Sequence, residues 1–147
     1  VTYMGNPYSC AFSGKALTFF SSRNLASPEL VEQRNIEERI DSVFYSDEYA
    51  AAIVRNTNGE YGSRLEVYKK DGTHVLSKEF NFEYTHADFD GDLIILYNED
   101  SCRIYNMSGT EKFDATFDFP VSKIRKGRFP GTLVVTGPQQ MQELKLR

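Results

Sequence analysis

One of the two histidines of the chain stands close to a cluster of carboxylates. His86 precedes Asp88 by two residues, and Asp88 opens the acidic run DFDGD (88–92). Residues two apart in a strand point to the same face, so His86 and Asp88 have the spacing of an acid–base pair or of one corner of a metal site. This pair carries the enzymatic hypothesis, a hydrolase-type or metal-dependent enzyme whose site is completed by missing residues or by another chain.

The pattern around this pair falls short of a catalytic or metal-binding signature. Two ligands are too few for a metal ion, and the acidic run does not have the ligand spacing of an EF-hand. Asp90-Gly91 is a strong hairpin signal, and Asp and Gly occur in such turns for backbone reasons alone. We therefore assign no catalytic residue, no metal ligand and no cofactor, and we favour a non-catalytic protein over the enzyme.

Aromatic residues offer a second kind of chemistry, which is the stacking of a sugar or a peptide on an exposed ring. The chain has 9 Tyr and 11 Phe but no Trp. Aromatic residues in strands usually pack between sheets, whereas those at a rim are free to contact a partner, which would be a protein or a glycan. The loop 58–61 is expected to line a groove or a central opening. The candidate binding residues are Tyr61, Tyr84, His86, Asp88 and Asp90.

The charge pattern argues against nucleic acid as a partner. The formal net charge is −4, and acidic and basic residues alternate along most of the chain. Only the stretch 122–128 is locally basic, and the charges of a solvated strand edge explain it. Because the chain lacks a broad positive field, it has no means of attracting a polyanion.

The cysteines and the apolar runs bound the class of protein further. Cys10 and Cys102 lack the C-x-x-C spacing of a zinc or dithiol site, and a disulfide between them stays open. No apolar run approaches the ~20 residues that cross a bilayer, so we expect no membrane span in this chain. The first residue is Val1 rather than Met, which suggests that an upstream segment was removed.

An internal repeat organises the chain. The segment RLEVYKKDG (64–72) recurs as CRIYNMSG (102–109), so that Val67 falls on Ile104 at an offset of 37 residues. Self-similarity at a fixed period of this size is typical of folds built from one repeated structural unit.

The same offset predicts equivalent positions in the outer copies. Gly72 falls on Gly109, one further step from Ile104 reaches Met141, and one step back from Val67 reaches Leu30. In that first copy Asn35 takes the glycine position. Asn is the residue that best replaces Gly in a left-handed turn.

Each copy contains further segments of strand length. Continuous apolar runs, which fit strands buried on both faces, precede the shared segment at 16–20, 50–54, 93–97 and 132–136. Another segment lies upstream of each run across a tight turn, at 8–12, 42–46, 85–89 and 121–125. A fourth segment follows at 36–40, 74–80 and 111–117. The stretch 27–40 has a helix-like start, but the register of the repeat favours strands there.

Four strands joined by tight turns in about 40 residues are typical of one propeller blade. We predict an all-β fold, a propeller-like array of about four four-stranded antiparallel blades that forms a partial propeller, with a β-sandwich as the second choice. Residues 1–147 are predicted to form a single domain. Its repeat units are expected at about 8–40, 42–80, 84–117 and 121–147.

Two ways of completing the ring stay open. Residues 1–4 would supply the outer strand of the last copy and close a four-bladed ring. Alternatively, a missing N-terminal half or a second protomer completes a larger ring, which would leave apolar faces exposed at the ends of the present array.

The aligned copies resemble an uncharacterised family of propeller-like proteins from Gram-positive, clostridial bacteria. The residues that carry the resemblance are AAAIVRN (50–56), SRLEVYKKDGTHVLSKEF (63–80), DGDLIILYNEDSCRIYNMSGTEKF (90–113) and GTLVVTGPQQMQELKL (131–146). The resemblance implies that this chain is the C-terminal half of a propeller that follows a membrane helix and lies outside the cytoplasm at the cell surface. It implies a binding or scaffolding module, since no activity is assigned in that family.

Overall fold

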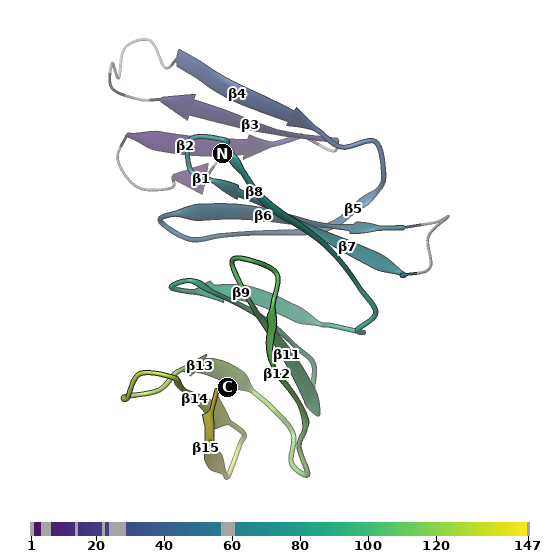
Figure 1. The fold of residues 1–147 in the computed structure, drawn as a ribbon, viewed down its shortest axis with the longest axis vertical. Helices are drawn as coiled ribbons and strands as arrows, with labels where there is room; N and C mark the ends of the chain where they lie inside the picture. Colours follow the sequence, from purple (N-terminus) through teal and green to yellow (C-terminus); the bar gives the residue numbers. More distant parts are fainter. Residues whose placement is uncertain are drawn as a thin grey trace. The chain divides into compact units, whose positions relative to one another are not determined.

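The computed structural model shows only β-strands as regular elements among the residues that it describes (Figure 1). Those residues are 2–3, 7–13, 15–21, 23, 29–56 and 61–146. The fifteen described strands form four antiparallel sheets, which confirms the all-β prediction. The chain divides into two compact units, residues 1–81 and 82–147. That the whole chain forms one domain stays a prediction.

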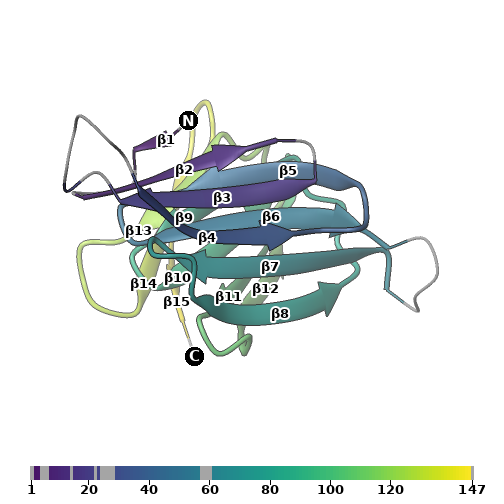
Figure 2. The same ribbon diagram turned by 90° about the horizontal axis from the view of Figure 1, so that it is seen from above.

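The first unit contains two four-stranded sheets. The first sheet has the strand order β1 (Thr2–Tyr3), β2 (Tyr8–Phe12), β3 (Ala16–Ser21) and β4 (Glu29–Asn35). The second has the order β5 (Ile40–Tyr45), β6 (Tyr49–Arg55), β7 (Ser63–Lys69) and β8 (His74–Phe80), and Figure 2 shows these four strands following one another across the sheet. Sequential strands are therefore spatial neighbours, as tight hairpin turns require.

The second unit contains one four-stranded and one three-stranded sheet. The first has the order β9 (His86–Asp90), β10 (Leu93–Tyr97), β11 (Ser101–Asn106) and β12 (Glu111–Thr116). The other has the order β13 (Lys123–Lys126), β14 (Thr132–Thr136) and β15 (Met141–Lys145). No described residue of either unit belongs to a helix that would be long and apolar enough to span a membrane.

Each unit has a hydrophobic core to which both of its sheets contribute. In the first unit the buried cluster consists of Cys10, Leu17, Phe19, Ile36, Ala50, Ala52, Val54 and Tyr68. In the second it consists of Ile95, Tyr97, Cys102, Ile104, Phe117, Phe119, Ile124, Leu133 and Val135. Successive residues of a strand point to opposite faces, yet every side chain from Ala50 to Val54 is buried. The apolar run is thus a strand buried on both faces, as its composition predicted.

The turn glycines confirm the repeat. Gly72 and Gly109 have φ of 89° and 83°, a left-handed conformation that side chains strongly disfavour. The N–H of Gly72 donates to the carbonyl of Lys69 at 2.9 Å, and the N–H of Gly109 donates to that of Asn106 at 3.0 Å. The two hairpins therefore close with the same turn, 37 residues apart.

The repeat register holds for the two middle sheets and fails at both ends. Val67 in β7 and Ile104 in β11 are fully buried. Met141, by contrast, is 70% exposed and pairs with Thr136, the place that Cys102 holds in its own sheet. The predicted equivalence of Met141 with Ile104 is therefore wrong by two residues. It fails because the connection between β13 and β14 is two residues longer than the one between β9 and β10: Lys126 pairs with Leu133, whereas Phe89 pairs with Ile94. The extra residues shift every later position of the last sheet.

The prediction that Asn35 replaces a turn glycine is also wrong. No described residue other than glycine has a positive φ. Asn35 instead ends β4, where it pairs with Ala16. The stretch 27–40 is not helical where it is described, because residues 29–35 form β4 and Ile40 begins β5.

The predicted fourth strand of the first copy, 36–40, is not formed. Residues 36–39 are a connection in which Ile36 is buried in the core, and Ile40 already belongs to β5. Four residues are too few to make a hairpin with β4 and then enter the next sheet. The first sheet gains β1 as its fourth strand instead, at the edge next to β2.

The pairing of β1 also excludes the first of the two alternatives that the sequence leaves open, in which residues 1–4 close the last sheet. Thr2 pairs with Cys10 and Tyr3 pairs with Ser9, so this segment extends the first sheet and not the last. The last sheet accordingly has three described strands, which are the three segments that the sequence predicts for the last copy. The four predicted blades are therefore four antiparallel sheets of three or four strands. Only the first departs from the predicted strand order, because β1 rather than 36–40 is its fourth strand.

Candidate functional site

The predicted pair His86 and Asp88 lies on β9, at the edge of its sheet, together with Asp90. His86 lies opposite Tyr97 on β10, and the two rings stack with centroids 4.9 Å apart and planes inclined by 8°. The Nδ1 atom of His86 lies 3.0 Å from the hydroxyl of Thr85. The histidine is therefore held by a ring and a hydroxyl rather than by a carboxylate.

The two carboxylates of β9 are engaged by backbone groups. Asp88 accepts a hydrogen bond from the N–H of Phe89 at 2.8 Å, and Asp90 accepts one from the N–H of Lys126 on β13. Within the described part of the chain, no hydrogen bond links His86 to Asp88, and no three potential ligands gather to hold a metal ion. The arrangement therefore offers no acid–base pair and gives Asp90 a structural role between two sheets.

The two predicted tyrosines belong to different units. Tyr61 is exposed and precedes β7 in the first unit. The rest of its predicted binding loop, residues 58–60, lies outside the described residues. Tyr84 is half-buried in the connection that leads into β9 in the second unit.

Three adjacent hollows occur on the second unit, and together they form what we call the rim groove. Their volumes are about 500, 340 and 260 Å³. The first and second share Glu99 and Asp100, and the second and third share Phe119 and Pro120. The first is lined by Thr85, His86, Asn98, Glu99, Asp100 and Val121. The second is lined by Glu99, Asp100, Phe117, Asp118, Phe119 and Pro120. The third is lined by Phe119, Pro120, Gly137, Pro138, Gln139 and Gln140.

Backbone hydrogen bonds fix the walls of the rim groove. The N–H of Phe117 donates to the carbonyl of Asp100 at 2.6 Å, and the N–H of Val121 donates to that of Glu99 at 2.7 Å. These bonds join the β10–β11 turn to the β12–β13 connection. Asn98 braces the turn, since its side-chain oxygen accepts from the N–H of Asp100 and its amide donates to the carbonyl of Glu83 at 2.7 Å. The acidic side chains therefore project from a fixed backbone.

The acidic part of the groove carries uncompensated charge. Glu99, Asp100 and Asp118 are exposed, and none of the ion pairs between described residues includes them. The residues that line the three hollows include no lysine or arginine. Carboxylates gathered in a hollow without counter-charges produce a negative potential that attracts cations.

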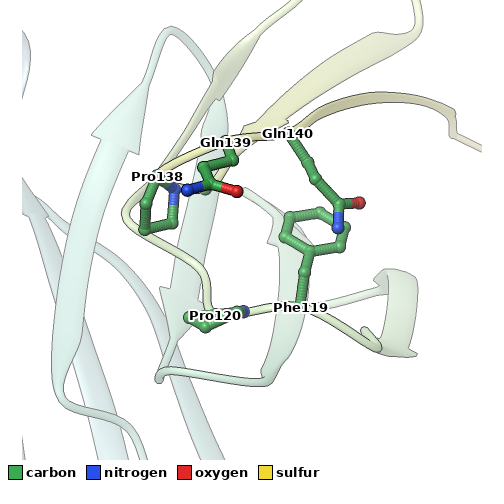
Figure 3. Close-up of a pocket in the computed structure, with 6 residues that line it drawn as sticks. Phe119, Pro120, Pro138, Gln139 and Gln140 are labelled. Atoms are coloured by element: carbon green, nitrogen blue, oxygen red, sulfur yellow. The ribbon is translucent and has the colours of Figure 1, made fainter.

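The opposite end of the groove is apolar. Figure 3 shows Pro138, Gln139 and Gln140 on one loop, facing Phe119 and Pro120 on another. Gly137 allows this approach, because a Cβ there would lie 2.6 Å from the carbonyl oxygen of Pro120 and 2.8 Å from the Phe119 ring. A glycine at the start of the β14–β15 turn therefore shapes the third hollow.

Of the predicted binding residues, His86 lines the groove, whereas Tyr61, Tyr84, Asp88 and Asp90 do not. Sequence reasoning missed the acidic and proline-containing turns, because each one looks like an ordinary solvated turn. The signal that would have found them is positional. Each of the turns NED (98–100), FDFP (117–120) and GPQQ (137–140) follows a predicted strand. In antiparallel units these strands run in the same direction, so the turns are expected at the same end of their units.

A separate polar cluster lies in the first unit, around the buried carboxylate of Glu66. Glu66 accepts from Arg64 Nε at 2.9 Å and from the hydroxyl of Ser77, and it lies 2.9 Å from His74 Nε2. Arg64 in turn makes a bidentate pair with Glu38 at 2.9 and 3.0 Å, and this pair lowers the pKa of Glu38 to about 2. These side chains use one another as hydrogen-bond and ion-pair partners, which is typical of a structural network rather than of a reactive site.

Both cysteines are free thiols buried in the cores of their units, and they do not form a disulfide. Burial raises the pKa of Cys10 to about 11 and that of Cys102 to about 12. Since the thiolate is the nucleophile, neither cysteine is suited to catalysis near neutral pH.

Comparisons with solved structures support the fold. The chain is similar to the computationally designed protein Ika4, with a TM-score of 0.52, 9% identity, and coverage of 94% of this chain and 89% of that one. It is also similar to Hsv2 of Kluyveromyces lactis, a propeller protein, with a TM-score of 0.57, 10% identity, and coverage of 100% of this chain and 44% of that one. Hydrazine synthase of Kuenenia stuttgartiensis gives a TM-score of 0.51, 7% identity, and coverage of 90% and 40%.

These likenesses show the fold alone, because the identities are low. The chain spans less than half of the Hsv2 and hydrazine synthase chains. A comparison with curated proteins finds no match. The four antiparallel sheets and the propeller-type neighbours make the fold propeller-like, as the repeat predicted. A sequence-family match covers residues 1–146, and the chain therefore belongs to the family of unknown function DUF5711.

Proposed function

We propose that this chain is a non-catalytic binding module that holds a partner protein in the rim groove of its second unit. The observation that carries the proposal is the groove itself, with exposed carboxylates at one end and a proline-lined apolar hollow at the other. Binding sites are concave and combine apolar surface with a few placed polar groups, and this groove has both.

The geometry gives the enzyme alternative no support. His86 lines the first hollow, but Asp88 lines none of the three. A general base must reach the proton that it removes, and the two side chains share neither a hydrogen bond nor a hollow among the described residues. The Tyr97 ring stacked on His86 accounts for the placement of the histidine without chemistry.

The test is site-specific photo-crosslinking within the full-length protein. A photoreactive amino acid replaces Gln139, which lines the groove, or Glu143, which lies on β15 outside it. The expected result is a product from position 139 with a protein that is then identified, purified and shown to bind the chain directly. Equal yields of the same product from positions 139 and 143 would count against the proposal.

Two further properties belong to the same proposal. We propose that the module lies outside the cytoplasm in a membrane-anchored protein, as the sequence resemblance implies, and protease accessibility in intact cells tests this. The ring is completed by further sheets of the same protein or by a second protomer. This second part is supported by the partial coverage of Hsv2 and by exposed apolar residues on β4, namely Leu30 and Val31, which are 58% and 42% exposed. Light scattering of the full-length protein separates one protomer from two.

A further inference from the structure

We infer that the occupant of the rim groove is an extended, positively charged peptide segment. A lysine or arginine lies at the acidic end, and an apolar side chain fills the proline-lined end. This inference rests on the proposed function and specifies the chemistry of the partner. It follows from the charge of the groove, from the exposure of its rings, and from the amide groups beside the apolar hollow.

The charge of the groove selects a cation. Glu99, Asp100 and Asp118 are exposed, their described contacts include no ion pair, and no lysine or arginine lines the hollows. A partner with a like charge would be repelled, whereas a lysine or arginine would gain a charge-assisted hydrogen bond. Acidic peptides and anionic glycans therefore do not fit.

The rings of the groove disfavour a neutral glycan. Sugars stack on the open face of an aromatic ring. The two phenylalanine rings of the groove, Phe117 and Phe119, are only 8% and 6% exposed, and they pack against each other with centroids 5.7 Å apart. They offer an edge to an apolar side chain and no platform to a sugar. The third ring of the groove, His86, already stacks on Tyr97 with centroids 4.9 Å apart.

The side chains at the apolar end suit a peptide backbone. Gln139 and Gln140 are exposed and line the third hollow, and the hydrogen bonds between described residues do not engage their side-chain amides. An amide supplies both a donor and an acceptor, which matches the N–H and C=O of an extended chain. The hollow between them and Pro120 then takes a side chain of that chain.

The fixed walls of the groove lower the cost of binding. The turn that carries Glu99 and Asp100 is tied to the connection that carries Asp118 by the two backbone hydrogen bonds to Phe117 and Val121. Preorganised groups lose little conformational freedom when a ligand arrives. Short peptides should therefore be sufficient to measure the preference of the groove for a basic segment with an apolar side chain.

The experiment uses three fluorescein-labelled decapeptides of matched length. One carries lysine and leucine, one glutamate and leucine, and one lysine and serine, each spaced by proline and serine. Fluorescence anisotropy measures their binding to the full chain at low salt and at about 0.3 M NaCl, where screening shortens the reach of exposed charges. The expected result is binding of the lysine–leucine peptide alone, with weaker affinity at the higher salt.

Three variants and one control locate the effect. Glu99→Gln and Asp118→Asn should each weaken binding up to about fivefold, the range expected for one exposed ion pair. Gln139→Lys should weaken it through like-charge repulsion. Glu143→Gln removes a similar charge from β15, outside the groove, and should leave binding unchanged. Thermal unfolding confirms that each variant is folded.

The outcomes separate the inference from the proposed function. If the glutamate–leucine peptide binds as well, or if Glu143→Gln weakens binding as much as Asp118→Asn, the inference is overturned. If NMR shifts of 137–140 report a neutral or acidic ligand, the groove is still a binding site and only the partner chemistry is wrong. If no peptide shifts these residues and position 139 crosslinks no more than position 143, both fail.

Discussion

The sheets β5–β8 and β9–β12 have the same strand order and the same 37-residue register, but they carry opposite charges at one equivalent position on the third strand. In the first, Glu66 on β7 pairs with Ala52 and Ser77; in the second, Arg103 on β11 pairs with Leu96 and Asp114. Arg103 lies 3.2 Å from Glu111 and 3.9 Å from Asp114. The equivalent positions, 37 residues apart, are Glu66, His74 and Ser77 in one sheet and Arg103, Glu111 and Asp114 in the other.

The difference shows which part of the repeat is constrained. The apolar positions and the turn glycines keep their types, because they are buried or have a positive φ. The charged positions are free to change sign, provided that the neighbours on the next strand change with them. A buried charge is tolerated only when it is paired, so the pairing is retained and the sign is not.

The largest expected effect tests where the 37-residue step holds. Ile104→Ala should lower the free energy of unfolding by about 4 kcal/mol, because it leaves a cavity at a fully buried position. Met141→Ala should cost less than about 0.5 kcal/mol, because Met141 is 70% exposed. Urea unfolding measures both. Similar losses of unfolding free energy for the two variants would indicate that Met141 is equivalent to Ile104 after all, against the observed register.

The next effect tests the turn that the two middle sheets share. Gly72→Ala should cost about 3 kcal/mol, because φ is 89° and the added Cβ would lie 2.6 Å from Cβ of Glu32. Gly131→Ala is the matched control, with φ of 74° and no atom within 4 Å of the added Cβ, and should cost about 1 kcal/mol. Equal losses in thermal unfolding would show that the contact with β4 is unimportant.

A smaller effect compares the two charged clusters directly. Glu66→Gln should cost about 2 kcal/mol, because a nearly buried carboxylate with three partners loses its charge. Arg103→Gln should cost about 1 kcal/mol, since its partners Glu111 and Asp114 are about half exposed. Chemical denaturation of both variants gives the difference, and a larger loss for Arg103→Gln would reverse the comparison.

The smallest expected effect is a pH dependence of the free energy of unfolding, which arises in the Glu38–Arg64–Glu66 cluster of the first unit. Pairing with Arg64 lowers the pKa of Glu38 from 4.5 to about 2, so the folded state binds this proton less readily than the unfolded state. The resulting stability is fully present above pH 4.5 and is lost as the pH falls towards 2. Because Glu38 is partly exposed, solvent screening limits the contribution of its pair with Arg64 to the free energy of unfolding to below about 1 kcal/mol. Glu38→Gln should flatten acid unfolding in this window, and an unchanged slope would refute the assignment.

The amino-acid sequence by itself determined the strand content, the turns and the repeat of the middle sheets. These features are local: apolar runs such as 50–54 and 93–97 have the length of a strand and are bounded by turn residues, and Gly72 and Gly109 mark turns that need a positive φ. The sequence also drew attention to His86, because histidine next to an acidic run is conspicuous, and this residue lines the first hollow of the proposed groove.

Only the tertiary structure decided the ends of the array and the groove. The pairing of β1 with β2 depends on which strand edge is available, and no local pattern specifies this. The two extra residues between β13 and β14 become apparent only from the pairing of these strands. The rim groove joins turns at 98–100, 117–120 and 137–140, which become neighbours only when the two sheets of the second unit pack on a common core. These turns are far apart in the sequence and line one groove only because the sheets that carry them pack together, which the sequence pattern does not specify.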